Sequence, residues 1–142
     1  MSWDYLNDIF GRLRKHRTRF TDLEEEAVGL IHSFVQGTMN DKDFANAFNG
    51  IRSQFLDLIN VNGETTFDQD TPLWLNMLLG NYFVDWLRFQ QIKWFFEEHP
   101  EEFTEERREQ FAQIQAIGYD TQFKDACRNV LKELESGFPE ES

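Results

Sequence analysis

Apolar residues recur every three or four positions along most of the chain, which is the spacing of one face of an α-helix. No stretch of alternating apolar and polar residues competes with this pattern. The pattern predicts six helical segments, packed as an all-α, single-domain helical bundle over residues 1–142. The longest segment is a central helix rich in aromatic residues.

The first three helices have recognisable start and stop signals. The first follows Ser2, and its apolar positions are Leu6, Ile9, Phe10 and Leu13. The second begins at Thr21-Asp-Leu-Glu24, which matches a capping box, and Gly37 stands where a left-handed C-cap is expected. Asn40 is the expected cap of the third helix, which ends near Asn60.

The centre of the chain combines a long loop with a long helix. Residues 61–70 form the longest predicted loop, and such a loop in a compact domain is often functional or mobile. Thr71 followed by Pro72 predicts the start of the fourth helix, which is apolar on most sides, as in the centre of a bundle. Running to about Glu98, this helix would be roughly 40 Å long, so we expect a kink at Gly80.

The last two helices also have start and stop signals. Thr104 is the expected cap of the fifth helix, and Gly118 ends it. Asp120 or Thr121 is expected to cap the sixth, and residues 137–139 supply its stop signals. The apolar face of the sixth helix comprises Phe123, Ala126, Cys127, Val130, Leu131 and Leu134.

Composition narrows the class of protein. The chain has 26 acidic and 14 basic side chains, a net charge of -12, which argues against binding nucleic acid or an anionic membrane directly. A single cysteine excludes an intramolecular disulfide and fits a reducing cytosol. The N-terminus does not have the pattern of a signal peptide, and polar residues interrupt the most apolar window, 73–96. We therefore expect a cytoplasmic protein, a monomer or weak dimer.

The residues that most often carry chemistry do not form a catalytic pattern. His16, His32 and His99 lie in three separate segments, without the spacing of a metal site. His32 and Cys127 are interpreted as structural residues, the latter as a buried packing thiol. The chain contains neither a glycine-rich phosphate loop nor a serine-hydrolase motif. We expect no enzymatic activity and no cofactor.

Part of the long loop has the composition of a calcium-binding loop. Asn60-Val-Asn-Gly63 resembles the middle of an EF-hand loop, with Gly63 at its sixth position. The first and twelfth positions would then be Leu58 and Gln69, where carboxylates are required, so the match fails. Two acids before the next helix are more typical of caps than of a cation site.

The charge is unevenly distributed. Residues 1–19 carry five basic and two acidic side chains, so the remainder of the chain has a charge of -15. We expect the basic stretch 12–19 to complement a helix C-terminus or to pair internally with acidic helices. The densest acidic run lies within 97–109, and a second group surrounds the long loop. A third group, Asp22 with Glu24–Glu26, is interpreted as solvated helix surface.

One stretch resembles a known family. Ala27-Val-Gly-Leu-Ile-His-Ser-Phe-Val-Gln-Gly-Thr-Met-Asn-Asp-Lys-Asp-Phe-Ala-Asn-Ala-Phe48 resembles the opening of immunity proteins of the colicin D type. In both, a helix ends in a phenylalanine, and a short turn leads to a helix with an aromatic residue at its first inward position. The likeness covers about residues 27–60 and is one of hydrophobic spacing. It implies a small acidic helical bundle that inhibits a tRNA-cleaving toxin by covering its basic active site.

Three functions are compared. The first is an immunity protein that neutralises a basic nuclease toxin of a competing or sibling bacterium by covering its active-site groove. The second is a nucleic-acid-mimicking inhibitor of a nuclease complex, of the kind that a phage encodes against host defence. The third, a metal-dependent helical-bundle enzyme, is disfavoured because the chain has no ligand pattern.

The toxin-binding residues are expected in two groups, each with aromatic side chains as anchors among the charges. The loop cluster comprises Asp57, Glu64, Phe67, Asp68, Asp70 and Trp74. The glutamate cluster comprises Trp94, Glu97, Glu98, Glu101, Glu102 and Glu105. A rigid cluster of carboxylates contributes little to packing and imitates the charge of a phosphate backbone, so both groups are candidate surfaces for a basic protein.

Overall fold

A computed structural model describes residues 4–136 and confirms an all-α bundle. The helices are α1 (Asp4–Lys15), α2 (Thr21–Gln36), α3 (Asp41–Ile59), α4 (Leu73–Met77), α5 (Phe83–Glu98), α6 (Glu105–Ile117) and α7 (Tyr119–Ser136). A π-helical segment, Leu78–Tyr82, joins α4 to α5, and a 3₁₀ turn, Pro100–Glu102, separates α5 from α6. Strands β1 (Asn60–Val61) and β2 (Glu64–Thr65) form a short hairpin after α3. The expected stop signals at 137–139 lie outside the described residues.

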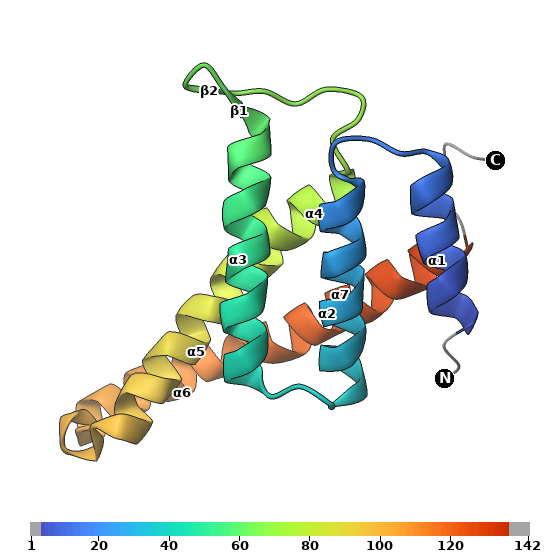
Figure 1. Cartoon of the computed structure of the whole chain (residues 1–142). Coiled ribbons are helices and arrows are strands. Elements are labelled where there is room, and N and C mark those ends of the chain that lie inside the picture. Colours follow the sequence, from blue (N-terminus) through green and yellow to red (C-terminus); the bar gives the residue numbers. More distant parts are fainter. Residues whose placement is uncertain (1–3, 137–142) are drawn as a thin grey trace.

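The helices are arranged around a central antiparallel pair. Figure 1 shows α2 and α3 side by side, with the α4–α5 rod and α7 crossing behind them. Helix α1 packs on α2 and α7 at one side of the bundle. At the opposite side, α5 and α6 extend beyond the start of α3, while the β-hairpin lies at the end of α3 (Figure 1). The α5–α6 segment and the β-hairpin therefore lie at opposite ends of α3.

An aromatic cluster forms the middle of the core and joins four helices. Its buried rings are Phe34 of α2, Phe44 of α3, Phe83 and Trp86 of α5, and Phe123 of α7. The ring centroids of Phe34 and Phe44 lie 4.1 Å apart, and those of Trp86 and Phe123 lie 4.9 Å apart, both pairs stacked. Aromatic pairs at such separations stabilise a core beyond the area that they bury.

The buried indole of Trp86 has its own polar partner. Its Nε1 donates to Asp120 Oδ1 at 2.9 Å, and Gln90 Nε2 donates to the same oxygen at 3.3 Å. Lys124 Nζ lies 3.1 Å from the other carboxylate oxygen. Asp120 or Thr121 was expected as the helix cap, and both are wrong: α7 begins at Tyr119, directly after Gly118, and the Asp120 carboxylate accepts from the indole instead. A buried indole N–H requires such an acceptor.

Four other helix-end signals are confirmed. Gly37 and Gly118 adopt the left-handed conformation, with φ of 78° and 81°, at the ends of α2 and α6. Asn40 and Thr104 cap α3 and α6, because each side-chain oxygen accepts a hydrogen bond from the backbone N–H three residues on, at 2.8 and 3.3 Å. These ends follow from local chemistry alone.

The expected capping box at the start of α2 is not formed. Thr21 Oγ1 accepts from the backbone N–H of Thr18, at 2.8 Å, while the side chain of Glu24 points inward and is only 7% exposed. The indole Nε1 of Trp74, in α4, donates to Glu24 Oε2 at 3.2 Å. The interpretation of Glu24 as solvated surface is therefore wrong, because α4 covers this part of α2.

The segment after α3 is only partly a loop. Asn62 and Gly63 have positive φ, 54° and 82°, and connect the paired strands β1 and β2. Asn-Gly is the most favourable pair for a two-residue hairpin turn, because both positions need left-handed backbone. The sequence analysis compared Asn62-Gly63 with a calcium-binding loop and did not predict the hairpin turn.

The long central helix is interrupted where a kink was expected. Residues 78–82, which include Gly80, form a π-helical segment between α4 and α5. Such segments are rare and occur mostly as single-turn bulges within α-helices, and glycine is an unfavourable residue in a regular helix interior. The apolar face continues through the interruption with Leu75, Leu78, Leu79, Phe83, Trp86 and Phe89, all buried.

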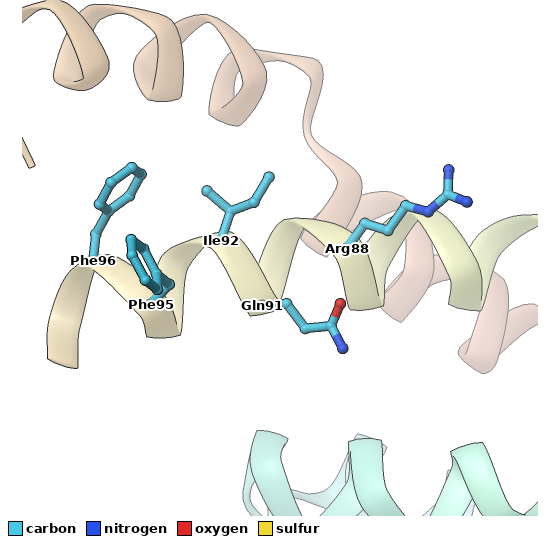
Figure 2. Close-up of a pocket in the computed structure, with 5 residues that line it drawn as sticks. All are labelled: Arg88, Gln91, Ile92, Phe95 and Phe96. Carbon is cyan, nitrogen blue, oxygen red and sulfur yellow. The ribbon is translucent and has the colours of Figure 1, made fainter. Parts of the chain in front are cut away.

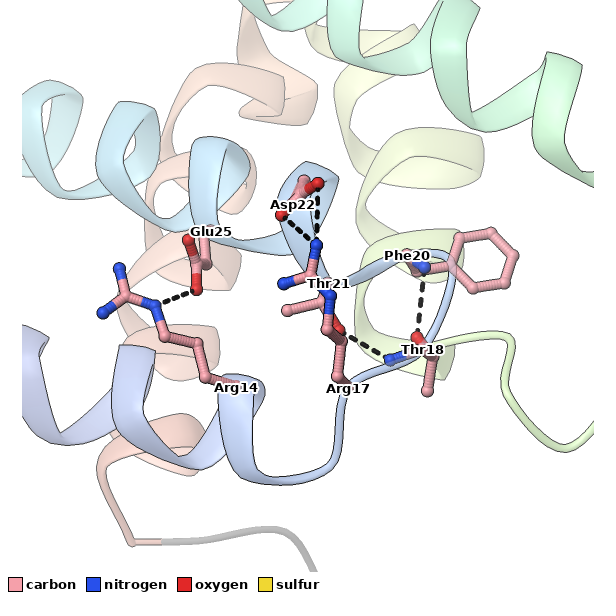
Figure 3. A network of polar contacts seen from close by, with 7 residues as sticks. All are labelled: Arg14, Arg17, Thr18, Phe20, Thr21, Asp22 and Glu25. Carbon is pink, nitrogen blue, oxygen red and sulfur yellow. Dashed lines mark hydrogen bonds and ion pairs between the residues drawn. The ribbon is translucent and has the colours of Figure 1, made fainter.

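The basic stretch is used internally, as the sequence predicted. Figure 3 shows Arg14 Nε donating to Glu25 at 2.8 Å and Arg17 Nη2 donating to both oxygens of Asp22, at 3.0 and 3.1 Å. Both acids lie in α2, so the pairs tie the end of α1 and the following turn to the next helix. The pairs are exposed, and each adds little stability.

Two further arginines of this stretch contact distant elements. Arg12 Nη1 donates to the backbone oxygens of Leu134 and Glu135, each at 2.6 Å, at the C-terminal end of α7. Arg19 Nη1 donates to Asp68 Oδ2 at 2.7 Å. A cation over the last carbonyls of a helix satisfies free acceptors and the helix dipole. Little of this positive charge is left to offset the acidic surfaces.

Candidate protein-binding surfaces

The two predicted groups of binding residues lie at opposite ends of α3. The loop cluster surrounds the β-hairpin and the start of α4, and the glutamate cluster lies where α5 turns into α6 (Figure 1). Lys42, in the first turn of α3, places its Nζ 3.7 Å from Glu98 Oε1, which locates the glutamate cluster at that end. The 19 residues of α3 span roughly 28 Å. The structure thus contains two separate candidate surfaces.

Within the loop cluster, Asp68 has a structural role. Its carboxylate accepts from Arg19 Nη1 and, at 3.3 Å, from the hydroxyl of Thr71. The hydrogen bond from Arg19 lowers the pKa of Asp68 below its usual value. The other acids of the cluster are exposed and form no ion pair within residues 4–136: Asp57, Glu64 and Asp70.

The aromatic members of the loop cluster differ in exposure. Phe67 is 56% exposed, whereas Trp74 is half-buried and its indole N–H is bound to Glu24. Sequence reasoning missed two apolar neighbours on α4, Leu73 and Met77, which are 70% and 51% exposed. Their separation of four residues, on a single helix face, was the available signal. Phe67 is the better anchor of this surface.

Glu24 is a buried carboxyl with an unusual titration. Burial raises its pKa from 4.5 to about 7, and the hydrogen bond from Trp74 opposes part of that rise. The folded protein therefore holds this proton more tightly than the unfolded chain between these two values. The stability that Glu24 contributes is fully present below the lower value and is lost as the pH rises through about 7.

Replacing Glu24 with glutamine should raise the free energy of unfolding at about pH 8, by up to roughly 3 kcal/mol, and change it little at about pH 5. The amide removes the cost of burying a carboxylate and still offers an oxygen to Trp74. Urea denaturation at both pH values tests this. Glu26→Gln, at an exposed site in the same helix, is the matched control and should show no such pH dependence. An equal effect of Glu24→Gln at both pH values would contradict the titration.

The acids of the glutamate cluster are exposed and weakly compensated. Glu102 pairs with Arg107 at 2.8 Å, and Glu101 lies 3.5 Å from His99 Nδ1. Glu97 and Glu105 form no ion pair with any described side chain. The end of α5 and the start of α6 therefore carry an excess of negative charge.

Trp94 is not an exposed anchor of this cluster. It is half-buried, and Lys42 Nζ lies 5.7 Å from its ring centroid, on the α3 side of α5. The lysine therefore contacts both Trp94 and Glu98, and it joins α3 to α5. A cation over an indole ring is a modest attraction that also buries the lysine stem.

Contacts between phenylalanine rings attach α6 and the turn before it to α5. The centroids of Phe89 and Phe111 lie 5.4 Å apart, and those of Phe96 and Phe103 lie 4.6 Å apart. No side chain of α6 is buried, so this helix covers α5 only partially. The two helices form a protruding hairpin, which carries the glutamate cluster at its tip (Figure 1).

A shallow pocket lies along α5 next to the glutamate cluster. It has a volume of about 450 Å³ and is lined by Arg88, Gln91, Ile92, Phe95 and Phe96 (Figure 2). Phe95 is 46% exposed and Ile92 is 37% exposed. Sequence reasoning missed this site because α5 is apolar on most sides, and periodicity does not reveal which apolar residues stay uncovered.

The histidine and cysteine side chains are consistent with their structural interpretation. Cys127 is buried, and burial raises the pKa of its thiol, so the unreactive protonated form dominates. Burial lowers the pKa of His32, which favours the neutral imidazole. Within residues 4–136, no three histidine, cysteine or acidic side chains are grouped to hold a metal ion. The helices of that part of the chain are also too short or too polar to cross a membrane.

Comparisons with known proteins do not place the chain in a family. No protein-family model matches it, and no curated protein and no solved structure is significantly similar to it. The function is therefore argued from the two surfaces themselves.

Proposed function

We propose that this protein is an immunity protein, which binds a basic nuclease toxin in the cytoplasm and inhibits it by covering its active-site groove. The toxin cleaves tRNA, as the resemblance of residues 27–60 to immunity proteins of the colicin D type implies. The protein acts by binding and needs no cofactor. The protruding α5–α6 hairpin carries this proposal, because it combines clustered glutamates with an exposed apolar pocket.

The charge distribution supports a basic protein as the partner. Arg12, Arg14, Arg17 and Arg19 are bound to acceptors in other parts of the fold. The glutamate cluster has few cations of its own, so its negative potential extends into solvent. Such a surface attracts a positively charged groove and accelerates association, an effect that weakens with salt.

The side-chain types of the hairpin also support a protein interface. Tight interfaces depend on a few apolar or aromatic anchors enclosed by polar residues that exclude water. Phe95 and Ile92 supply exposed apolar area, and the glutamates supply the polar rim. The loop cluster, with Phe67 among its acids, is the second place where these features coincide.

Co-expression with the adjacent gene, as the candidate toxin gene, tests the proposal. The protein should restore growth of cells that express the toxin, and the purified protein should block RNA cleavage by the purified toxin at equimolar concentration. A toxin variant that has lost cleavage activity but keeps its fold is the binding control and should still be captured. Absence of both protection and binding would contradict the proposal.

The second candidate is a nucleic-acid mimic that inhibits a nuclease complex. The observation that favours it is the presence of acidic surfaces at both ends of α3, roughly 28 Å apart, as on an extended polyanion. Under this function, the protein should compete with RNA or DNA for several unrelated basic nucleases. An immunity protein should inhibit its cognate toxin alone.

A further inference from the structure

The α5 pocket has an apolar floor that the charge of the glutamate cluster does not explain. Ile92, Phe95 and Phe96 line it, and four of its five lining residues are exposed. Figure 2 shows these side chains along one side of α5, with Arg88 at the end away from the phenylalanines. A contiguous exposed apolar surface with a polar border is typical of a protein-binding site.

The end of the pocket near Phe95 is negative. The Phe95 ring packs on the imidazole of His99, with centroids 4.8 Å apart, and His99 Nδ1 lies 3.5 Å from Glu101. Glu98 follows Gln91 by two helical turns and therefore lies on the same face of α5, where Lys42 of α3 offsets part of its charge at 3.7 Å. The C-terminal end of α5 adds the negative end of its dipole.

The other end of the pocket is close to neutral. Arg88 is exposed and has no hydrogen bond or ion pair to any residue in the described part of the chain. Asp85, one turn earlier, is also exposed. One guanidinium thus balances one carboxylate at this end, so the potential along the pocket becomes more negative toward Glu98 and Glu101.

We propose that the pocket binds an amphipathic basic helix of the toxin, lying antiparallel to α5. This inference rests on the proposed function and names the part of the partner that binds. Apolar residues of that helix pack on Ile92 and Phe95, and its basic N-terminal turn lies over Glu98 and Glu101. The carbonyls at its C-terminal end face Arg88. The length of α5 from residue 88 to 98 accommodates about ten residues of such a helix.

The shape and charge of the pocket favour this occupant. Small-molecule sites enclose most of their ligand and supply several directed polar groups, whereas this pocket is shallow and opens to solvent. A second copy of the chain would bring two acidic surfaces of like charge close together, which opposes that arrangement. An amphipathic basic helix can pack its apolar face on the pocket and place its positive charges near the negative end.

A peptide probe tests the site with the full-length protein. The probe is a helical peptide of about 12 residues with leucines at helical spacing and lysines elsewhere. The first comparison peptide has the same composition with its leucines rearranged so that no helix face is apolar, and a second has glutamate in place of lysine. Fluorescence anisotropy should show binding of the first peptide, at least tenfold weaker binding of the rearranged peptide, and none of the acidic one.

Matched variants locate the binding. Ile92→Ser with Phe95→Ser should weaken peptide binding at least tenfold, and the control Phe67→Ser with Leu73→Ser, at exposed apolar positions near the other end of α3, should not. A nitroxide on the peptide N-terminus should broaden amide signals of residues 97–102 in NMR spectra, and one on its C-terminus those near Arg88. Equal binding of both lysine peptides, equal effects of both double variants, or the reverse broadening would overturn the proposal.

Three further outcomes are informative, and the last two separate this inference from the proposed function. If the free wild-type protein is a dimer and the Ile92→Ser, Phe95→Ser variant is a monomer, the inference is overturned, because a second copy would then occupy the pocket. If that variant loses the peptide but still inhibits the toxin fully, the inference fails and the immunity function stands. If the wild-type protein binds the peptide in the pocket but gives no protection against the toxin, the immunity function fails, and the pocket remains a site for a basic helix of another protein.

Discussion

Replacing Trp86 with alanine should lower the free energy of unfolding by about 4 kcal/mol, the largest effect of any single substitution that we expect here. Trp86 is 0% exposed and lies in contact with rings from α2, α3 and α7. Its removal leaves a cavity at the junction of four helices and leaves Asp120 without its indole donor. Urea denaturation followed by circular dichroism measures the change through the midpoint at constant slope.

Trp86→Phe separates the two causes of this loss. Phenylalanine keeps most of the ring packing and removes only the N–H, so we expect a cost of roughly 1–2 kcal/mol. Asp120 then retains Gln90 Nε2 and Lys124 Nζ. Phe95→Ala, at an exposed aromatic position in the same helix, should cost less than about 1 kcal/mol. A similarly small cost for Trp86→Ala would show that the aromatic cluster is not the centre of the core.

The helices could be predicted because their signals are local. Gly37, Asn40, Thr104 and Gly118 act on backbone groups within a few residues, so their roles do not depend on the rest of the fold. The apolar periodicity also identified the buried faces of α3 and α7, because residues at helical spacing share one side. A kink was expected at Gly80, and the structure has a π-helical segment, Leu78–Tyr82, at this position.

The errors occur where a tertiary contact competes with a local one. Asp120 and Glu24 were both expected at helix starts as caps, and each instead accepts a hydrogen bond from a tryptophan of a distant helix. An indole N–H that must be buried needs an acceptor, and this need outweighs a cap that water can replace. Which carboxylate meets which tryptophan depends on helix packing, and periodicity carries no information about it.

The sequence identified residues of the candidate surfaces, but not where these residues lie in the fold. The acids of both clusters are exposed, in keeping with their charge, yet only the fold shows that the two clusters lie at opposite ends of α3. The α5 pocket was missed because Ile92 and Phe95 belong to a helix that is apolar nearly all round. Since α6 covers this helix only in part, some of its apolar residues remain available to a partner.

Reversing the charge of Glu97 and Glu101 to lysine should slow association with the toxin by about 100-fold at low ionic strength and much less at about 0.5 M salt. These acids are preferable to Glu102, which pairs with Arg107. Glu97 has no ion pair in the described structure, and Glu101 has only the 3.5 Å contact with His99. The urea midpoint should therefore stay unchanged. Stopped-flow measurement of the association rate constant over a range of salt concentrations tests the prediction.

The matched control for this prediction is the double reversal of Asp57 and Glu64 to lysine at the other end of α3. Both acids are exposed and unpaired within residues 4–136, whereas Asp68 is bound to Arg19 and its reversal would disturb the loop. The two double variants change the net charge equally, so a slowing caused by total charge would be the same in both. A larger effect at Glu97 and Glu101 places the toxin on the α5–α6 hairpin, and a larger effect at Asp57 and Glu64 places it at the β-hairpin. If neither variant slows association, the proposal of an electrostatically steered acidic interface is wrong, because such an interface cannot lose four units of favourable charge without a change in rate.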